Sequence, residues 1–177
     1  MNLTETNVDG VLLINVAPLK DARGFFARSF CSDILARAGH PFKISQENIS
    51  FNTQVGTLRG LHYQATPAGD PKIVRCERGE IWDVAVDLRP GSSTYLQWAG
   101  ANLSADNAAA MLIPEGCAHG FISLQAATQV LYLMGEPYAP ERARGVRWDD
   151  PTFKIDWPLA PKVMSDRDAT YPDYKAS

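Results

Sequence analysis

The chain is divided into many short strand-like runs by turn sequences, and this division limits the folds open to it more than any other feature. Runs of apolar and β-branched residues alternate with turn-forming stretches such as DARG, PAGDP, ERGE and PEG. This alternation is typical of a β-sandwich or β-barrel. It predicts strands over 11–16, 44–51, 57–63, 72–77, 80–88, 95–103, 110–114, 119–124, 128–134 and 145–148.

The clearest strand is the run EIWDVAVDL at 80–88. Its even-numbered residues, from Trp82 to Leu88, are apolar and are expected to face the core, because side chains alternate across a strand. The other face carries two carboxylates, Asp83 and Asp87. That face is either a solvated surface or the wall of a polar cavity.

One helix stands out, SDILARAG at 32–39, with Ser32 or Asp33 as the expected N-cap and Gly39 as the C-cap. Neither internal repeats nor linkers are evident. We therefore expect an all-β fold of two antiparallel sheets with one or two short helices and an irregular C-terminal tail. Residues 1–177 are expected to form a single domain, since 177 residues suffice for one buried core.

Composition argues against several partners. A net charge of -3 gives no reason to expect nucleic acid or a membrane surface, which usually bind basic patches. No apolar run approaches the roughly 20 residues of a membrane span, and the amino terminus lacks a secretory pattern. Three widely spaced cysteines, Cys31, Cys76 and Cys117, fit reduced thiols of a cytoplasmic protein.

The sequence has three histidines, and two of them lie near a glycine in strand-like segments: His62 in RGLHYQ and His119 in PEGCAHGF. His40 follows the helix and is expected in a surface loop. Each of the other two could be an ordinary strand residue, a metal ligand or a base. Gln64 occupies the position where a cupin-type HxH metal pair would place its second histidine, so we expect no metal.

General acid–base chemistry fits these residues better than nucleophilic catalysis, since neither a nucleophile elbow nor a phosphate loop is present. Histidine exchanges protons near neutral pH and works best beside a carboxylate. Asp166 and Asp168 in SDRD could supply one, although such groups are usually solvated loop charges. Tyr132 could equally be a core residue. Periodicity alone does not join these residues into one site.

Several segments occur in a specific order: DARGFFARSF, QENIS, GTLRGLHYQ, KIVRCERGEIWDVAVDLRPGSSTY, IPEGCAHGF, YLMGEPYAPERARGVRWDDP and SDRD. Together they closely resemble the dTDP-4-dehydrorhamnose 3,5-epimerase family, from about residue 10 to 172. The resemblance implies a cupin-type jelly-roll barrel, a homodimer, no metal and no organic cofactor. It also implies epimerisation at C3, C5 or both of a nucleotide-linked 4-keto-6-deoxyhexose.

The resemblance implies roles for particular residues. His62 would be the base, Asp168 its carboxylate partner, and Tyr132 the acid on the opposite face of the sugar. Lys72 and His119 would lie near the keto oxygen and the sugar. Contacts to the nucleotide or its diphosphate would come from Arg23, Phe26, Gln46, Asn48, Arg59, Tyr138 and Arg167.

Two positions depart from the common family pattern: Arg28 replaces a glutamate and Ile49 a histidine. The nucleotide or sugar could therefore differ from that of the rhamnose pathway, or a single carbon could be inverted. A metal-dependent cupin enzyme and a non-catalytic binding module are the competing interpretations. Strict alternation would also separate Arg59 from His62, so we expect a bulge or twist at Gly60.

Overall fold

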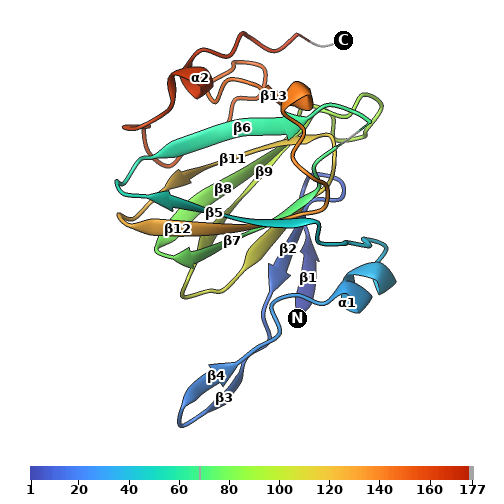
Figure 1. Ribbon diagram of the computed structural model, residues 1–177, viewed down its shortest axis with the longest axis vertical. Helices are drawn as coiled ribbons and strands as arrows, with labels where there is room; N and C mark the ends of the chain where they lie inside the picture. The colour runs from blue at the N-terminus through green and yellow to red at the C-terminus, as the bar shows by residue number, and fades with distance from the viewer. Residues whose placement is uncertain (68, 176–177) are drawn as a thin grey trace.

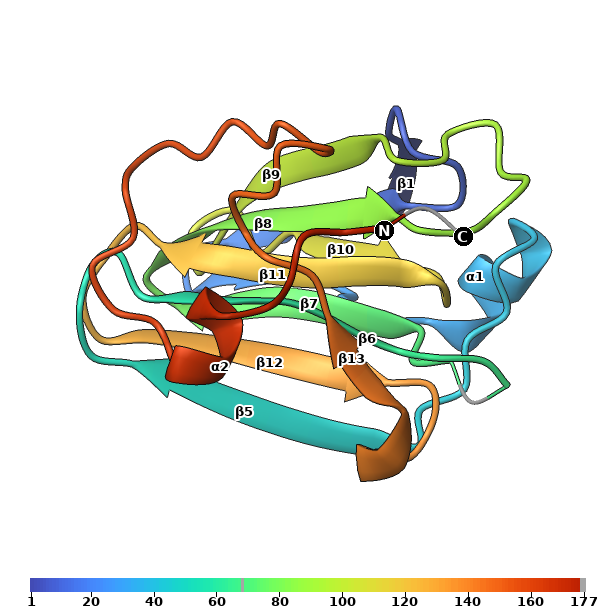
Figure 2. The same cartoon turned by 90° about the horizontal axis from the view of Figure 1, so that it is seen from above.

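The computed structural model describes residues 1–67 and 69–175, and within them two antiparallel sheets pack face to face (Figures 1 and 2). The larger sheet has the order β1 (Asn2–Glu5), β2 (Leu12–Asn15), β10 (Ala110–Ile113), β7 (Lys72–Arg78), β12 (Thr128–Met134) and β5 (Gln46–Asn52). The smaller has the order β13 (Ala143–Gly145), β6 (Leu58–Gln64), β11 (Cys117–Ser123), β8 (Glu80–Asp87) and β9 (Trp98–Ser104). The all-β prediction is confirmed.

Few elements lie outside the two sheets. A hairpin of β3 (Leu19–Asp21) and β4 (Gly24–Phe26) projects from the body, as Figure 1 shows at the bottom of the view. The helical elements are α1 (Ser32–Arg37), a 3-10 turn (Pro140–Arg142) and α2 (Asp166–Ala169). Among the described residues, no helix has the length and apolar character needed to cross a bilayer.

Strand β8 is buried on both faces, which the sequence only half predicts. Ile81 and Ala85 pack with Phe121 between the two sheets. On the other face, Val84 packs with Phe153 of the C-terminal tail. One face of the strand therefore packs against the opposite sheet and the other against the C-terminal tail. Alternation between apolar and polar residues predicted only one buried face.

Helix α1 begins and ends differently from its prediction. Its N-cap is Cys31, without a side-chain cap, so the expectation of Ser32 or Asp33 is wrong. The helix ends at Arg37 with Ala38, not the expected Gly39, as its C-cap, and Gly39 follows with φ +87°. The amide of His40 bonds the carbonyl of Leu35, a Schellman pattern that favours glycine at the left-handed position.

The three cysteines are free, as expected for thiols that form no disulfide. Cys76 and Cys117 are buried in the core between the sheets. Burial raises the pKa of the Cys76 thiol to about 11 and that of Cys117 to about 12. Both thiols therefore remain protonated and unreactive at neutral pH.

Candidate active site

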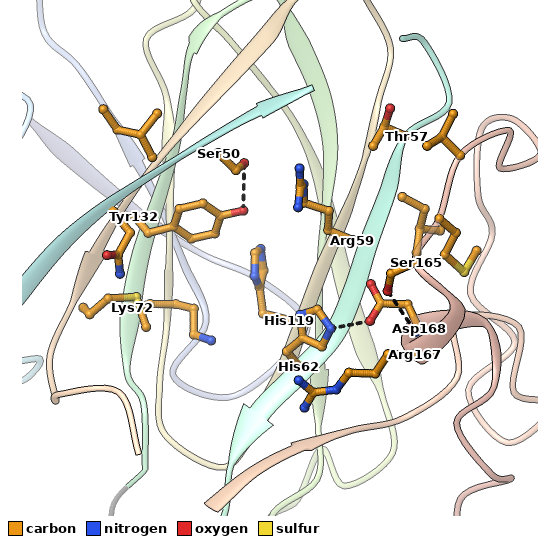
Figure 3. A pocket seen from close by; sticks show the side chains of 16 residues that line it. Ser50, Thr57, Arg59, His62, Lys72, His119, Tyr132, Ser165, Arg167 and Asp168 are labelled. Atoms are coloured by element: carbon orange, nitrogen blue, oxygen red, sulfur yellow. Dashed lines mark hydrogen bonds and ion pairs between the residues drawn. The ribbon is translucent and has the colours of Figure 1, made fainter. Parts of the chain in front are cut away.

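A cleft of about 600 Å³ opens between the two sheets and is closed on one side by the segment around α2 (Figure 3). Strands of both sheets contribute side chains to it, so groups enter it from opposite directions. The lining residues predicted from the sequence are Asn48, Arg59, His62, Lys72, His119, Tyr132, Arg167 and Asp168.

His62 and Asp168 form a hydrogen-bonded pair at the edge of this cleft, with 2.7 Å between Nε2 and Oδ1. The Asp168 side chain is 6% exposed and that of His62 is 41% exposed, so the carboxylate is shielded from solvent while the imidazole remains accessible. Ser165 caps α2 by accepting the Asp168 amide proton, which fixes the turn carrying the carboxylate. The structure thus joins two residues 106 positions apart.

The charge on Asp168 is maintained against its burial. Burial alone would raise the pKa of the carboxyl, but the His62 ring and the Gly60 amide outweigh it and hold the pKa below its ordinary value. The carboxylate therefore stays ionised at neutral pH. An ionised partner fixes the His62 tautomer and stabilises the ring once it has gained a proton.

The predicted irregularity at Gly60 is confirmed. His62 pairs with His119 and Arg59 with Phe121, so two residues of β6 oppose the single Gly120 of β11. Gly60 has φ +132°, and a Cβ built there would lie 2.5 Å from the Gly120 Cα. This bulge turns Arg59 and His62, three positions apart, into the same cleft. It also directs the Gly60 amide to Asp168 Oδ2, at 3.2 Å.

His119 has a carboxylate of its own. Its Nε2 lies 2.7 Å from Oδ1 of Asp83, and Asp83 is fully buried. Asp83 is therefore not on a solvated surface, and it does not line the cleft itself; it is buried against His119, which does. Asp87 of the same face is also buried, but it binds Arg89 away from the cleft.

Tyr132 reaches the cleft from β12, in the sheet opposite His62 and His119 (Figure 3). Its ring packs edge-on against His119, with 6.1 Å between ring centroids. The hydroxyl has one long contact, 3.4 Å to Ser50 Oγ. Burial raises the pKa of Tyr132 above its ordinary value, so the phenol carries its proton at neutral pH.

Lys72 lies on the cleft wall with a partner that sequence reasoning missed. Its Nζ donates to Asp70 Oδ2 at 2.6 Å, and both side chains are buried. The signal was a carboxylate two positions before a strand lysine, in the segment DPK. β7 is an interior strand of its sheet, so Lys72 is enclosed by neighbouring strands rather than placed at a sheet edge.

The other predicted binding residues divide into three groups. Arg59 lines the cleft, held by Asn52 Oδ1 at 2.8 Å. An adjoining cavity of about 500 Å³ shares His62, Asn48 and Arg167 with the cleft and adds Gln46 and Tyr138. Arg23 and Phe26 are in neither cavity.

Arg23 and Phe26 lie on the projecting β3–β4 hairpin instead. Phe26 is 75% exposed, and Arg23 forms an ion pair with Asp21 on the hairpin itself. Of the two departures from the family pattern, Ile49 lines the cleft while Arg28 is exposed beyond the hairpin. Within residues 1–67 and 69–175, no group of three or more His, Cys, Asp or Glu side chains is arranged to hold a metal ion.

Comparison with known proteins gives matches over nearly the whole chain. A family model described as dTDP-4-dehydrorhamnose 3,5-epimerase matches residues 5–176. The enzyme of that name from Pseudomonas aeruginosa is 44% identical over 171 residues, covering 95% of this chain and 93% of the relative.

Solved structures give the same picture. The dTDP-4-dehydrorhamnose 3,5-epimerase from Bacillus anthracis, with TDP and PPi bound, superposes with a TM-score of 0.93 at 38% identity, covering 98% of this chain and 99% of that one. A double mutant of a 3′-monoepimerase from Streptomyces bikiniensis, in complex with dTDP, superposes with a TM-score of 0.88 at 31% identity. The match covers 96% of this chain and 85% of that one.

Proposed function

The chain belongs to the dTDP-4-dehydrorhamnose 3,5-epimerase family and is an isomerase, and from this premise we propose how its residues act. The reaction is epimerisation of a nucleotide-linked 4-keto-6-deoxyhexose at C3, at C5 or at both carbons. The C4 ketone acidifies the protons on both neighbouring carbons. Inversion therefore needs a base on one face of the sugar ring and an acid on the other.

His62 is the base, and the observation that carries this assignment is its 2.7 Å contact with Asp168. Because Nε2 is bonded to the carboxylate, Nδ1 is left to take the proton from carbon. A positioned base of this kind contributes roughly 10²–10⁴-fold to the rate. The accessible imidazole of His62 lines the cleft, where a sugar can reach it.

Tyr132 is the acid. Its strand belongs to the opposite sheet from that of His62, so a sugar ring bound between the sheets meets one residue on each face. A phenol whose pKa is raised by burial keeps its proton until the enolate forms. Reprotonation from the Tyr132 side then inverts the carbon.

Lys72 and His119 lie near the keto oxygen. Removal of the proton moves negative charge onto the C4 oxygen, and a cationic or N–H donor placed there stabilises charge that is absent from the bound substrate. Interactions that strengthen only in the transition state are those that increase the rate. Both side chains line the same cleft as His62.

The nucleotide and its diphosphate extend from the sugar along the residues shared with the adjoining cavity. Arg59 and Arg167 offer guanidinium groups, which bind phosphate oxygens in pairs. Asn48, Gln46 and Tyr138 continue the path toward the outer end of that cavity. Similar proteins with TDP and dTDP bound support a nucleotide-linked substrate.

The protein acts as a homodimer. The β3–β4 hairpin carries Leu19, Phe25 and Phe26 at 72%, 57% and 75% exposure, an apolar tip that favours burial against another chain. Arg23 and Phe26 could contact a nucleotide only if the hairpin reached the cleft of a second copy. Light scattering should give twice the mass of one chain, and Phe26→Ser should lower that mass and raise KM.

Incubation with dTDP-4-keto-6-deoxyglucose in deuterated water tests the function. Deuterium at C3, C5 or both, read by NMR, identifies the carbons from which a proton is removed, and the ring-proton couplings of the product show which of them are inverted. His62→Ala should abolish the exchange. Parallel incubations with CDP-, UDP- and GDP-linked 4-keto sugars identify the nucleotide. They are needed because Arg28 and Ile49 depart from the common family pattern. No exchange with any of these substrates would contradict the proposal.

A further inference from the structure

The buried ion pair of Asp70 and Lys72 lies at the boundary between the cleft and the adjoining cavity. Lys72 lines the cleft beside His62 and His119, whereas Asp70 lines the adjoining cavity. Their side chains are 5% and 8% exposed. Figure 3 shows the amine of Lys72 directed toward the histidine side of the cleft.

Asp70 is anchored by backbone groups and not only by the lysine. Its Oδ1 accepts the Gln64 amide proton at 2.9 Å, at the end of β6. The next residue, Pro71, accepts the Gly135 amide at 2.7 Å, just beyond β12. The carboxylate is therefore bonded directly to β6, while the backbone that follows it is held by the residue after β12. Its Oδ2 is the acceptor for Lys72, at 2.6 Å.

A lysine buried to this degree needs such a partner. An ammonium removed from water loses its hydration, and a carboxylate in hydrogen-bond contact replaces part of that stabilisation only when the geometry is good and its other oxygen is satisfied. Asp70 meets both conditions. Lysine is also flexible along four carbons, so without a fixed acceptor its ammonium would have no single position.

Resting on the function proposed above, we infer that Asp70 is a positioning residue that aims the Lys72 ammonium at the keto oxygen of the substrate. An ammonium has three N–H donors, and Asp70 occupies one of them. The remaining two are available to an oxygen in the cleft that Lys72 lines, where the enolate develops its charge. The carboxylate also balances the lysine charge before that oxygen becomes negative.

Steady-state kinetics with Asp70→Asn test this inference. The amide keeps the shape and an acceptor oxygen but removes the charge, so the ammonium loses its fixed direction while the cleft keeps its form. We expect kcat to fall on the order of 10- to 100-fold, the effect of misplacing a catalytic group by about 1 Å, with little change in KM. Asp70→Glu, which restores the charge, should retain more of kcat than Asp70→Asn.

A double-mutant cycle separates positioning from a merely structural role. In a Lys72→Met background, Asp70→Asn should cause no further loss of kcat, because the group through which it acts is absent. Asp150→Asn is the matched control, since Asp150 is a buried carboxylate bonded to the Thr152 and Tyr174 amides outside the cleft. It should lower thermal stability and leave kcat unchanged.

Two results would overturn the inference: an unchanged kcat in Asp70→Asn, or an equal fold-loss from Asp70→Asn with and without Lys72. Deuterium exchange by the wild-type protein distinguishes this failure from failure of the proposed function. Exchange by the wild type together with either result rejects only the role of Asp70. Absence of exchange in the wild type rejects the epimerase activity itself.

Discussion

His62 and His119 are register partners on neighbouring strands β6 and β11, yet each bonds a different aspartate at 2.7 Å. Asp168 arrives from the C-terminal segment, and Asp83 from β8 of the same sheet. The two pairs also differ in exposure, since the His62 side chain is 41% exposed and that of His119 only 5%. The more exposed pair can exchange protons with a bound ligand and with solvent, which favours His62 as the base.

Replacing Asp168 with asparagine should leave His62 in place but remove the charge that stabilises its protonated ring. We expect kcat to fall about 10²- to 10⁴-fold, the range of a general base, with a small change in KM. Stopped assays across substrate concentration measure both constants. A kcat equal to that of the wild type would show that His62 needs no ionised partner.

Tyr132→Phe should separate proton removal from inversion. His62 can still abstract a proton and return deuterium to the same face, so deuterium enters the substrate while the epimer fails to accumulate. NMR of the sugar distinguishes these two outcomes in one sample. Ser50→Ala, which removes the long contact to the Tyr132 hydroxyl, is the control and should retain inversion. Normal epimer formation by Tyr132→Phe would mean that another group is the acid.

Gly60→Ala should damage both stability and activity, because the new Cβ would meet the backbone of Gly120 and the residue would have to keep φ +132°. Gly91→Ala is the control, since Gly91 has φ +87° with nothing within 4 Å of a Cβ. The control should cost about 1–2 kcal/mol of unfolding free energy, the strain of a left-handed backbone at a residue with a Cβ, and Gly60→Ala clearly more. Equal costs, from chemical denaturation, would refute the close approach of the two strands.

Acid should destabilise the fold through Asp87. Burial would raise the pKa of this carboxyl, but hydrogen bonds from Arg89, Ser92 and Thr94 outweigh it and hold the pKa well below the ordinary value of 3.8. A lowered folded-state pKa gives stability that is complete above the unfolded pKa and is lost as pH falls. Unfolding free energy should therefore decrease from about pH 5 downward. Asp87→Asn should have a lower unfolding free energy than the wild type at pH 7, and that free energy should change less as the pH falls. A pH dependence as steep as that of the wild type would contradict this.

Much of the strand pattern was predictable from the sequence, since buried runs such as β8 and β12 are apolar and bounded by turn residues. The hairpin strands β3 and β4 and the strand β1 were not predicted, because few of their side chains are buried and no alternation marks them. The predicted strand at 145–148 is displaced to 143–145, where Gly145 pairs with His62. The position of a short edge strand depends on its pairing with the adjacent strand, and the local sequence does not encode that pairing.

The site was predictable in its residue types but not in its connections. Sequence marked His62 and His119 by their glycines, and resemblance marked Asp168 and Tyr132. Asp70 and Asp83 were not recognised as partners, because a carboxylate in a turn or on a strand face looks the same whether it meets solvent or a buried cation. Whether such a carboxylate is solvated or paired with a buried cation depends on contacts between strands that form only in the folded protein.

The pairing of His62 with Asp168 has a consequence for the order in which the protein is made. A ribosome completes all the barrel strands before it adds the helical turn that carries the carboxylate, 106 positions after the histidine. The strand that carries the base is therefore separated from its carboxylate partner by most of the barrel sequence. A chain clipped ahead of Ser165 would keep every strand of the two sheets and lose the carboxylate on which its base depends.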